Sequence, residues 1–249
     1  MSVVVTGGAR GVGRAVAERL AEHGTVVVVD LDEEALAWTE GVERITAVVG
    51  SAADPAVAER AADTAGALTG WVNNAAVFRD ASPHTAPPET ILELIELNLA
   101  PAVVGSAAAV RRFLAAGTGG AIVNMSSHQA QRPVPGCVPY ATAKAAIEGL
   151  TRAMAAEYGP DGIRVNAVAL GSVRTGRHDD LLAAEPGRAG EITRRMRDLH
   201  ALGRMGLPGE AAEAVAFLLS ERAGFITGVT LPVDGGRAIL AQDPESARE

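Results

Sequence analysis

Short runs of β-branched apolar residues alternate along the chain with longer, Ala-rich segments of helical periodicity. In the first such segment, Val12, Val16 and Leu20 share one helical face. Uniformly apolar strands separated by helices are typical of a parallel sheet covered on both faces, so we expect an α/β fold. The expected strands are residues 2–6, 25–30, 45–50, 71–76, 121–127, 163–170 and 228–236, and the expected helices are 13–24, one beginning near Asp32, 55–66, 88–116, 139–158 and 209–221.

No composition break, long linker or repeat divides the sequence, so we expect one domain over residues 1–240. Residues 172–205 are long, charged and weakly patterned, and they lie between the last two expected strands. This is where we expect a mobile lid over a substrate. Residues 241–249 are expected to form a disordered tail.

The composition argues against nucleic-acid and membrane partners. The net charge of the 249-residue chain is -8, and no basic stripe is present. We find no signal peptide before the first strand and no apolar run that we expect to span a bilayer. The single cysteine, Cys137, excludes an internal disulfide and is compatible with a reducing compartment. We therefore expect a soluble cytoplasmic protein.

Four glycines separate the first strand from the first helix: Gly7, Gly8, Gly11 and Gly13. Glycines at such a turn allow backbone N–H groups to approach a pyrophosphate, and the helix N-terminus adds positive partial charge. Their G-x-x-x-G-x-G spacing differs from the general G-x-G-x-x-G fingerprint, and glycines can simply mark a turn. Their position between strand and helix favours a nucleotide site.

Asp30 closes the second strand, where a carboxylate can accept hydrogen bonds from adenosine ribose hydroxyls and repel a 2′-phosphate. Arg10, in the glycine loop, could instead pair with a 2′-phosphate. Because repulsion rejects a ligand as well as failing to attract it, Asp30 is the stronger signal. The sequence thus favours NAD over NADP.

Tyr140 and Lys144 are four residues apart, so their side chains share one face of the expected helix. A nearby ammonium would stabilise a tyrosine phenolate and lower its pKa toward working pH. Lys144 is also the only lysine in the chain. An arginine would be less suitable here, because its wide planar guanidinium would crowd its partners. Ser127 ends a strand thirteen residues before Tyr140, at the edge where open α/β sheets bind ligands.

These features together resemble the classical short-chain dehydrogenase/reductase family, from residue 3 to about 237. The matching motifs, in chain order, are TGGARGVG (6–13), NNAA (73–76), Asn98 in LNLAP, Ser127, YATAK (140–144), NAVALGSVRT (166–175) and FITGVTLPVDGG (225–236). The resemblance implies a single doubly wound, Rossmann-type parallel sheet of about seven strands. It also implies a homotetramer or homodimer, with helices near 95–115 and 140–158 at the interfaces.

The resemblance also implies a role for each matching residue. Tyr140 would exchange a proton with the substrate oxygen, and Lys144 would hold the nicotinamide ribose and tune the tyrosine. Ser127 would orient the carbonyl, and Asn98 would position a water in the proton relay. The residues expected at the cofactor are Gly7, Arg10, Gly11, Val12, Gly13, Asp30, Leu31, Ser51, Asn74, Ala75, Tyr140, Lys144, Val173 and Thr175.

Three positions depart from the family pattern. Ser51, or Asp54 in a shifted register, stands where an aspartate often lies near the adenine. Leu170 replaces the proline of the family's P-G pair, and Ala76 replaces a glycine that allows close backbone approach. These changes concern cofactor affinity and geometry and leave the four candidate catalytic residues in place.

Substrate contacts are expected from His128, Gln129 and Pro135, with Phe78 as a further candidate. The five histidines show no metal-ligand spacing, so no metal site is expected. The cluster Arg194, Arg195 and Arg197 is either a solvated helix face or, if the lid turns it inward, a binding site for an anionic substrate.

We therefore expect an NAD(H)-dependent oxidoreductase that interconverts a small-molecule secondary alcohol and its ketone. An NADPH-dependent 3-oxoacyl or polyketide-type ketoreductase is the nearest alternative. A non-catalytic dinucleotide sensor on the same fold is an alternative from another class. The sensor would not require Ser127, Tyr140, Lys144 and Asn98 together, and all four are present.

Overall fold

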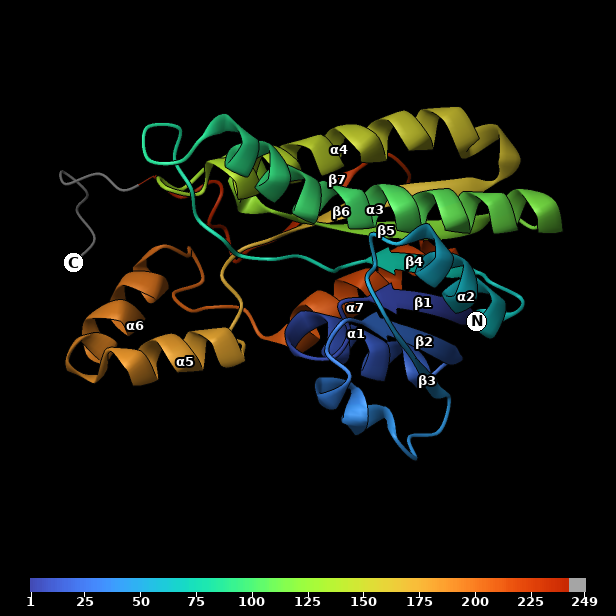
Figure 1. Cartoon of the computed structure of the whole chain (residues 1–249), viewed down its shortest axis with the longest axis horizontal. Helices are drawn as coiled ribbons and strands as arrows, with labels where there is room; N and C mark the ends of the chain where they lie inside the picture. The colour runs from blue at the N-terminus through green and yellow to red at the C-terminus, as the bar shows by residue number, and fades with distance from the viewer. Residues whose placement is uncertain (242–249) are drawn as a thin grey trace.

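The computed structural model describes residues 1–241 and contains one seven-stranded sheet, in which all paired strands are parallel (Figure 1). The strand order β3-β2-β1-β4-β5-β6-β7 confirms the predicted doubly wound fold. Its members are β1 (Ser2–Thr6), β2 (Thr25–Asp30), β3 (Ile45–Val49), β4 (Gly70–Asn73), β5 (Gly120–Ser127), β6 (Ile163–Leu170) and β7 (Thr230–Val233). Residues 242–249, most of the expected tail, lie outside the described part.

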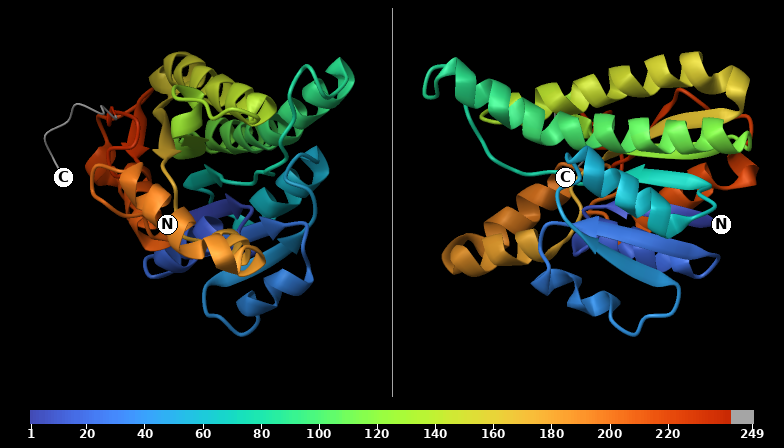
Figure 2. Two further views of the ribbon diagram at one scale, coloured as in Figure 1. Left: turned by 90° about the vertical axis from the view of Figure 1, so that its left-hand side faces the viewer. Right: turned by 45° about the vertical axis from the view of Figure 1, so that its right-hand side comes forward.

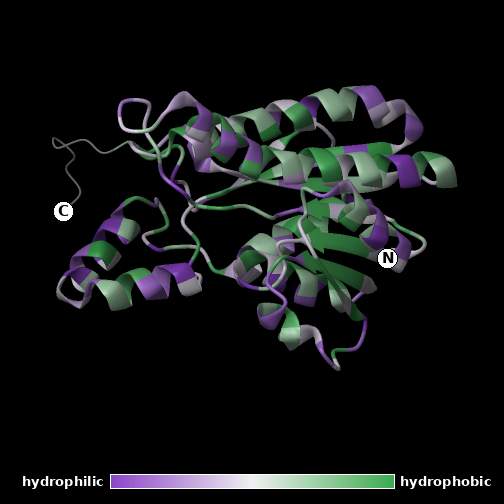
Figure 3. Ribbon diagram, viewed as in Figure 1, coloured by the Kyte–Doolittle hydropathy of each residue, from purple (hydrophilic) through white to green (hydrophobic). Residues whose placement is uncertain are grey.

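The central strands are apolar on both faces because helices cover both. Val3, Val4 and Val5 of β1 have no exposed surface. Val3 and Val5 join the cluster under α1 (Gly11–Ala21) and α7 (Pro208–Leu219), whereas Val4 joins the cluster under the opposite helices. Those helices are α2 (Pro55–Ala65), α3 (Pro88–Ala116) and α4 (Val138–Tyr158), and Figure 2 shows α3 and α4 together on one side. Figure 3 shows β1 and β2 as predominantly hydrophobic.

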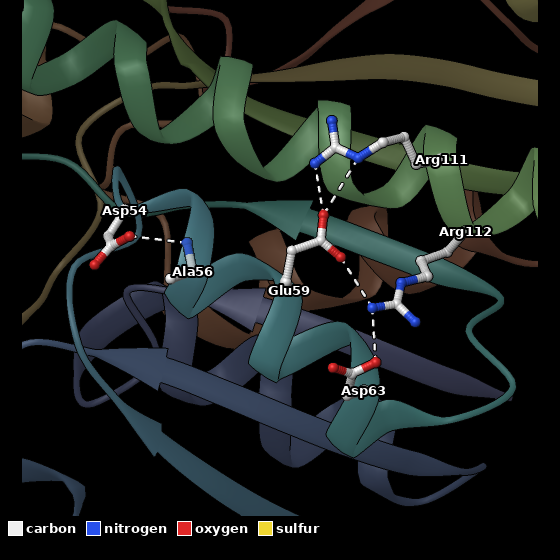
Figure 4. Close-up of polar contacts among 6 residues, drawn as sticks. All are labelled: Asp54, Ala56, Glu59, Asp63, Arg111 and Arg112. Atoms are coloured by element: carbon white, nitrogen blue, oxygen red, sulfur yellow. Dashed lines mark hydrogen bonds and ion pairs between the residues drawn. The ribbon is translucent and has the colours of Figure 1, made fainter.

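An ion-pair network joins α2 to α3 on the surface (Figure 4). Glu59 accepts hydrogen bonds from Arg111 Nη2 at 2.6 Å and from Arg112 Nη2 at 2.9 Å, and Arg112 also pairs with Asp63 at 2.7 Å. The pKa of the Glu59 carboxyl lies below its usual range, mainly because Arg111 donates hydrogen bonds to it. Because the network is partly exposed to solvent, its contribution to stability is small.

Helix α3 is, by length and composition alone, long and apolar enough to cross a membrane. This contradicts the expectation that no apolar run in the sequence is long enough. Packing accounts for part of this apolar surface, because 39% of the apolar stretch of α3 is buried inside the protein. Phe113 is 1% exposed in the core, and Ser106 accepts a hydrogen bond from Asn73 of β4 at 2.9 Å. The buried face of α3 is that of a helix packed on a sheet, and other apolar side chains of the helix, such as Leu92 and Val103, are exposed.

Residues 172–205 contain two helices that the sequence pattern did not predict, α5 (Gly176–Ala184) and α6 (Ala189–Asp198). Neither helix has a buried residue, and both stand away from the sheet in Figures 1 and 2. The helix expected near Asp32 is a 3-10 helix, Glu34–Thr39. Strand β4 ends at Asn73 instead of residue 76, because the next two backbone N–H groups bind the Thr6 hydroxyl.

Candidate active site

The glycine loop between β1 and α1 lies where the strand order reverses, since β1 has β2 on one side and β4 on the other. Gly7 and Gly11 adopt left-handed backbone conformations with φ of +68° and +57°. A Cβ on Gly13 would lie 2.1 Å from the Gly7 carbonyl oxygen, so only glycine fits there. This close-packed loop at a helix N-terminus fits the pyrophosphate of a dinucleotide.

Asn74 and Ala75 hold this loop against the end of β4. The Asn74 side chain donates to the Thr6 and Gly7 carbonyl oxygens at 3.1 and 2.8 Å. Ala75 lies so close to Gly7 that a Cβ on that glycine would be 2.7 Å from the Ala75 Cα. Both residues are therefore adjacent to the glycine loop, as the predicted cofactor site requires.

Asp30 lies at the end of β2 beside the same loop. Its carboxylate accepts hydrogen bonds from the backbone N–H groups of Ala9 at 3.0 Å and Asp32 at 3.2 Å. Arg10 forms an ion pair with Asp32, so a neighbouring carboxylate already neutralises its charge. Leu31 is 70% exposed next to Asp30. This rim of the site therefore carries more negative than positive charge.

Other predicted cofactor residues occupy two further sides of the loop. Val12 is half-buried against the core under α1, and Thr175, just before α5, would lie 3.4 Å from a Cβ on Gly11. Val173 pairs with Gly206 in an isolated parallel bridge. The residues from 173 to 175 thus bring the start of the 172–205 segment to the glycine loop.

Ser51 and Asp54 follow β3, and the structure separates their roles. The Asp54 side chain caps α2 by accepting from Ala56 N at 2.8 Å (Figure 4). The Ser51 hydroxyl accepts from Ala53 N at 3.2 Å within the turn. Because Asp54 is used as a helix cap, Ser51 remains the candidate for the adenine end of the site.

Tyr140 lies in the first turn of α4 and is only 7% exposed. Its pKa is raised to about 12, mainly by burial. A hydrogen bond with the Ser127 side chain opposes this rise. The pKa is not lowered as the sequence predicted, because desolvation of the phenolate is the larger effect. Tyr140 and Ser127, thirteen residues apart in the chain, are brought together as predicted.

Lys144 lies one turn after Tyr140 and is 3% exposed. Its Nζ donates to the Met125 carbonyl oxygen of β5 at 2.7 Å and lies 5.4 Å from the centre of the Tyr140 ring. Burial lowers the pKa of Lys144 to about 8. The contact with β5 fixes the amine at the carboxyl edge of the sheet.

Asn98 lies inside α3 and is 3% exposed. Its Nδ2 donates to the Leu94 carbonyl oxygen at 3.0 Å, and its Oδ1 accepts from the backbone N–H of Val77 at 3.0 Å. The side chain therefore ties α3 to the segment that follows β4 and leads to Phe78.

Phe78 packs on Tyr140, with ring centroids 4.8 Å apart and an interplanar angle of 32°. Arg177 of α5 lies over Phe78, with its Cζ 4.1 Å from the ring centroid. Its charge also acts to lower the pKa of Tyr140, although less than burial raises it. Arg177 was not predicted, because no pattern in the sequence indicates that α5 reaches residue 78.

The predicted substrate residues differ in their environments. His128 is 8% exposed, Gln129 is half-buried, and Pro135 is exposed. Within residues 1–241, His128 Nδ1 and Gln129 Oε1 are buried without a hydrogen-bond partner. Arg195 and Arg197 of the exposed cluster pair with acidic neighbours on α6, which favours a solvated helix face over an inward-facing anion site.

Glu148 is a buried carboxylate that sequence reasoning missed. It lies one turn after Lys144 in α4 and is 5% exposed. Its oxygens accept hydrogen bonds from the Ser126 hydroxyl at 3.0 Å and from Gln131 Nε2 at 3.2 Å. It thereby fastens α4 to the end of β5 and to the loop after it. Its i, i+4 spacing from Lys144 could have indicated that Glu148 lies on the same buried face of the helix.

Comparison with known proteins agrees with this geometry. The family model described as enoyl-(acyl carrier protein) reductase matches residues 7–238. The chain is 38% identical to 2-(S)-hydroxypropyl-CoM dehydrogenase 3 of Xanthobacter autotrophicus, with 96% of both chains covered. It is 33% identical to L-2,3-butanediol dehydrogenase of Corynebacterium glutamicum, with 94% of this chain and 96% of the relative covered.

The solved structures include a gluconate 5-dehydrogenase from Burkholderia cenocepacia J2315 in complex with NADP and tartrate. It matches with a TM-score of 0.85 and 30% sequence identity, covering 96% of this chain and 95% of that one. The match over nearly the whole length identifies the protein as an oxidoreductase acting on CH–OH groups. The chain belongs to the short-chain dehydrogenase/reductase family, whose members bind a nicotinamide dinucleotide.

Proposed function

We propose that the protein interconverts a secondary alcohol and its ketone with NAD(H), and that Tyr140 is the general acid and base. The observation that carries this proposal is the grouping of Tyr140, Ser127 and Lys144 at the carboxyl edge of the sheet, beside the glycine loop. The nicotinamide cofactor supplies or accepts the hydride.

Each residue has a distinct task in the proposed reaction. With a pKa of about 12, Tyr140 is a neutral phenol at working pH, which is the form that donates a proton to a carbonyl oxygen during ketone reduction. Alcohol oxidation needs the phenolate, and a protonated Lys144 stabilises that form by charge. Ser127 hydrogen-bonds the substrate oxygen. Asn98 ties α3 to the segment after β4 and positions a water of the proton relay.

NAD is the proposed cofactor because of the charges at the end of β2. Asp30 faces the glycine loop. Arg10 is the cation that could bind a 2′-phosphate, but it is paired with Asp32. A 2′-phosphate would therefore meet net negative charge. The Burkholderia relative was solved with NADP, so the preference has to be measured in this chain.

Two variants test the function and the cofactor separately. Tyr140→Phe should retain NADH binding, measured by fluorescence titration, and lose at least about 1,000-fold in turnover of secondary alcohols. Normal turnover would refute the mechanism. Asp30→Ala should raise kcat/KM for NADP relative to NAD at least tenfold, because the repelling carboxylate is gone. A wild-type enzyme that already prefers NADP would refute the cofactor assignment.

The proposal includes a cytoplasmic homotetramer or homodimer, with the 172–205 segment as a substrate lid. Exposed apolar side chains on α3 support association, including Leu92 at 66% and Val103 at 44% exposure. Light scattering coupled to gel filtration measures the assembly. A monomer at micromolar concentration would contradict it.

A further inference from the structure

A cavity of about 250 Å³ lies next to the candidate active site. It is lined by His128, Arg132, Val134, Leu199, Arg237 and Leu240. These residues come from the segment after β5, the end of α6 and the turn after β7. Because His128 directly follows Ser127, the cavity begins one residue from the group that is proposed to hold the substrate oxygen.

The cavity contains more positive charge than its surroundings neutralise. Within residues 1–241, neither Arg132 nor Arg237 has a carboxylate within ion-pair distance. The nearby Asp234 uses its two oxygens on the backbone N–H groups of Gly236 at 2.9 Å and Ala238 at 2.8 Å. The charge of Asp234 acts on Arg237, but the two side chains do not form an ion pair.

Arg237 is held in place but not satisfied. Its Nη1 donates to the Ser172 hydroxyl, and this is its one hydrogen bond from the guanidinium among the described residues. A guanidinium has five N–H donors. Arg237 is half-buried, and burial is the main effect that lowers its pKa. An anion in the cavity would supply the missing acceptors.

His128 supplies the second, independent observation. The residue is only 8% exposed, and its Nδ1 has no hydrogen-bond partner among the described residues. Burial, followed by the charge of Arg237, lowers its pKa to about 4, so the ring is neutral at physiological pH and can present one N–H donor. A hydrogen bond with the Arg132 backbone and the charge of Asp234 favour protonation of His128, whereas His200 opposes it. The neutral ring lets a donor sit beside Arg237 without adding charge repulsion.

We propose that this cavity binds a carboxylate carried by the substrate itself, with Arg237 and Arg132 as charged partners and His128 as a neutral hydrogen-bond partner. The inference rests on the proposed function and narrows its substrate class to hydroxy acids and the corresponding oxo acids. A carboxylate matches the fork of a guanidinium, which can donate two parallel hydrogen bonds to it. Val134, Leu199 and Leu240 contribute apolar side chains to the lining of the cavity, which can contact the carbon chain of such a substrate.

The test compares hydroxy acids with their uncharged primary amides: 2-hydroxypropanoate, 3-hydroxybutanoate and 4-hydroxypentanoate. For at least one chain length, the wild-type kcat/KM should be at least tenfold higher for the acid than for the amide. Arg237→Gln should lower this acid-to-amide ratio about 10- to 100-fold, the loss expected for a charge-assisted hydrogen bond. Arg237→Lys should restore part of it. Arg222→Gln, an exposed arginine outside the cavity, is the matched control and should leave the ratio unchanged.

Failure of this inference and failure of the proposed function give different results. Turnover of 2-butanol and the amides, with no preference for any acid, would overturn the carboxylate site and leave the function intact. No turnover of any alcohol would overturn the proposed function. In that case calorimetric titration with 3-hydroxybutanoate tests the carboxylate site alone. Binding to the wild type that Arg237→Gln weakens at least tenfold supports the site. No binding to the wild type, or equal binding to both proteins, overturns it.

Discussion

The ammonium of Lys144 provides a direct test of how burial sets the chemistry of this site. The side chain is 3% exposed and makes one hydrogen bond, to the Met125 carbonyl oxygen. Burial lowers its pKa from 10.5 to about 8. At 1.36 kcal/mol per pH unit, this difference corresponds to a cost of about 3 kcal/mol for keeping the amine charged in the folded protein.

The sign of the resulting pH dependence follows from proton binding. Between pH 8 and 10.5 the unfolded chain holds the lysine proton and the folded protein does not, so this group makes stability rise with pH. Below pH 8 the full cost is present. Replacing Lys144 by Met removes the cost but leaves the Met125 carbonyl without its donor, which costs about 1 kcal/mol or more. We therefore expect Lys144→Met to stabilise the ligand-free protein by about 1–2 kcal/mol at pH 7.

The assay has two parts. Urea unfolding of the wild type and Lys144→Met at pH 7, 9 and 10 should show the stability difference moving by about 2–3 kcal/mol in favour of the wild type, so that the advantage of the variant is lost or reversed by pH 10. Arg152→Met, an exposed position on the same helix, should show no such trend, because arginine stays protonated throughout. Because Lys144 is the only lysine, labelling with [13Cε]lysine gives a single resonance whose titration midpoint should lie near 8. A midpoint near 10.5, or a pH-independent stability difference, would refute the reasoning.

Three further substitutions have defined outcomes. Gly13→Ala should weaken NADH binding at least tenfold in a fluorescence titration and lower the Tm, because the new methyl would lie 2.1 Å from the Gly7 carbonyl oxygen. Asn98→Leu should lower the Tm and kcat together, since the Val77 N–H loses its acceptor, at a cost of about 1–3 kcal/mol, and the link between α3 and the Val77 segment is broken. Glu59→Gln should cost less than about 1 kcal/mol in urea unfolding, because its arginine pairs are partly exposed.

The fold could be predicted from the sequence because its strands are buried on both faces. Val3, Val4 and Val5 read as an apolar run for the same reason that they have no exposed surface. Helices α5 and α6 were missed, because both are short, bury no residue and carry few apolar side chains among many charged ones. Strand β4 was predicted too long because the Thr6 hydroxyl competes with the ladder for the backbone N–H groups after Asn73.

The candidate site was predictable where its parts are close in the chain or belong to one motif. Tyr140 and Lys144 share a helical face, and their spacing alone brings them together. The cavity beside them joins His128 to Arg237, more than one hundred residues later, and no local pattern indicates that contact. The rise of the Tyr140 pKa could not be predicted from the sequence either. It depends on how far the surrounding residues, including Phe78, exclude water from the hydroxyl.

Burial shifts Tyr140 and Lys144 in opposite directions on the pH scale, and both shifts favour the uncharged form. The two charged forms, phenolate and ammonium, are therefore each costly alone and less costly together, since each then has a partner of opposite charge. This coupling lets one proton loss at Tyr140 be stabilised by the proton kept on Lys144. The compact ammonium of Lys144 fits between the Met125 carbonyl oxygen and the Tyr140 ring, where the wide planar guanidinium of an arginine would crowd both partners.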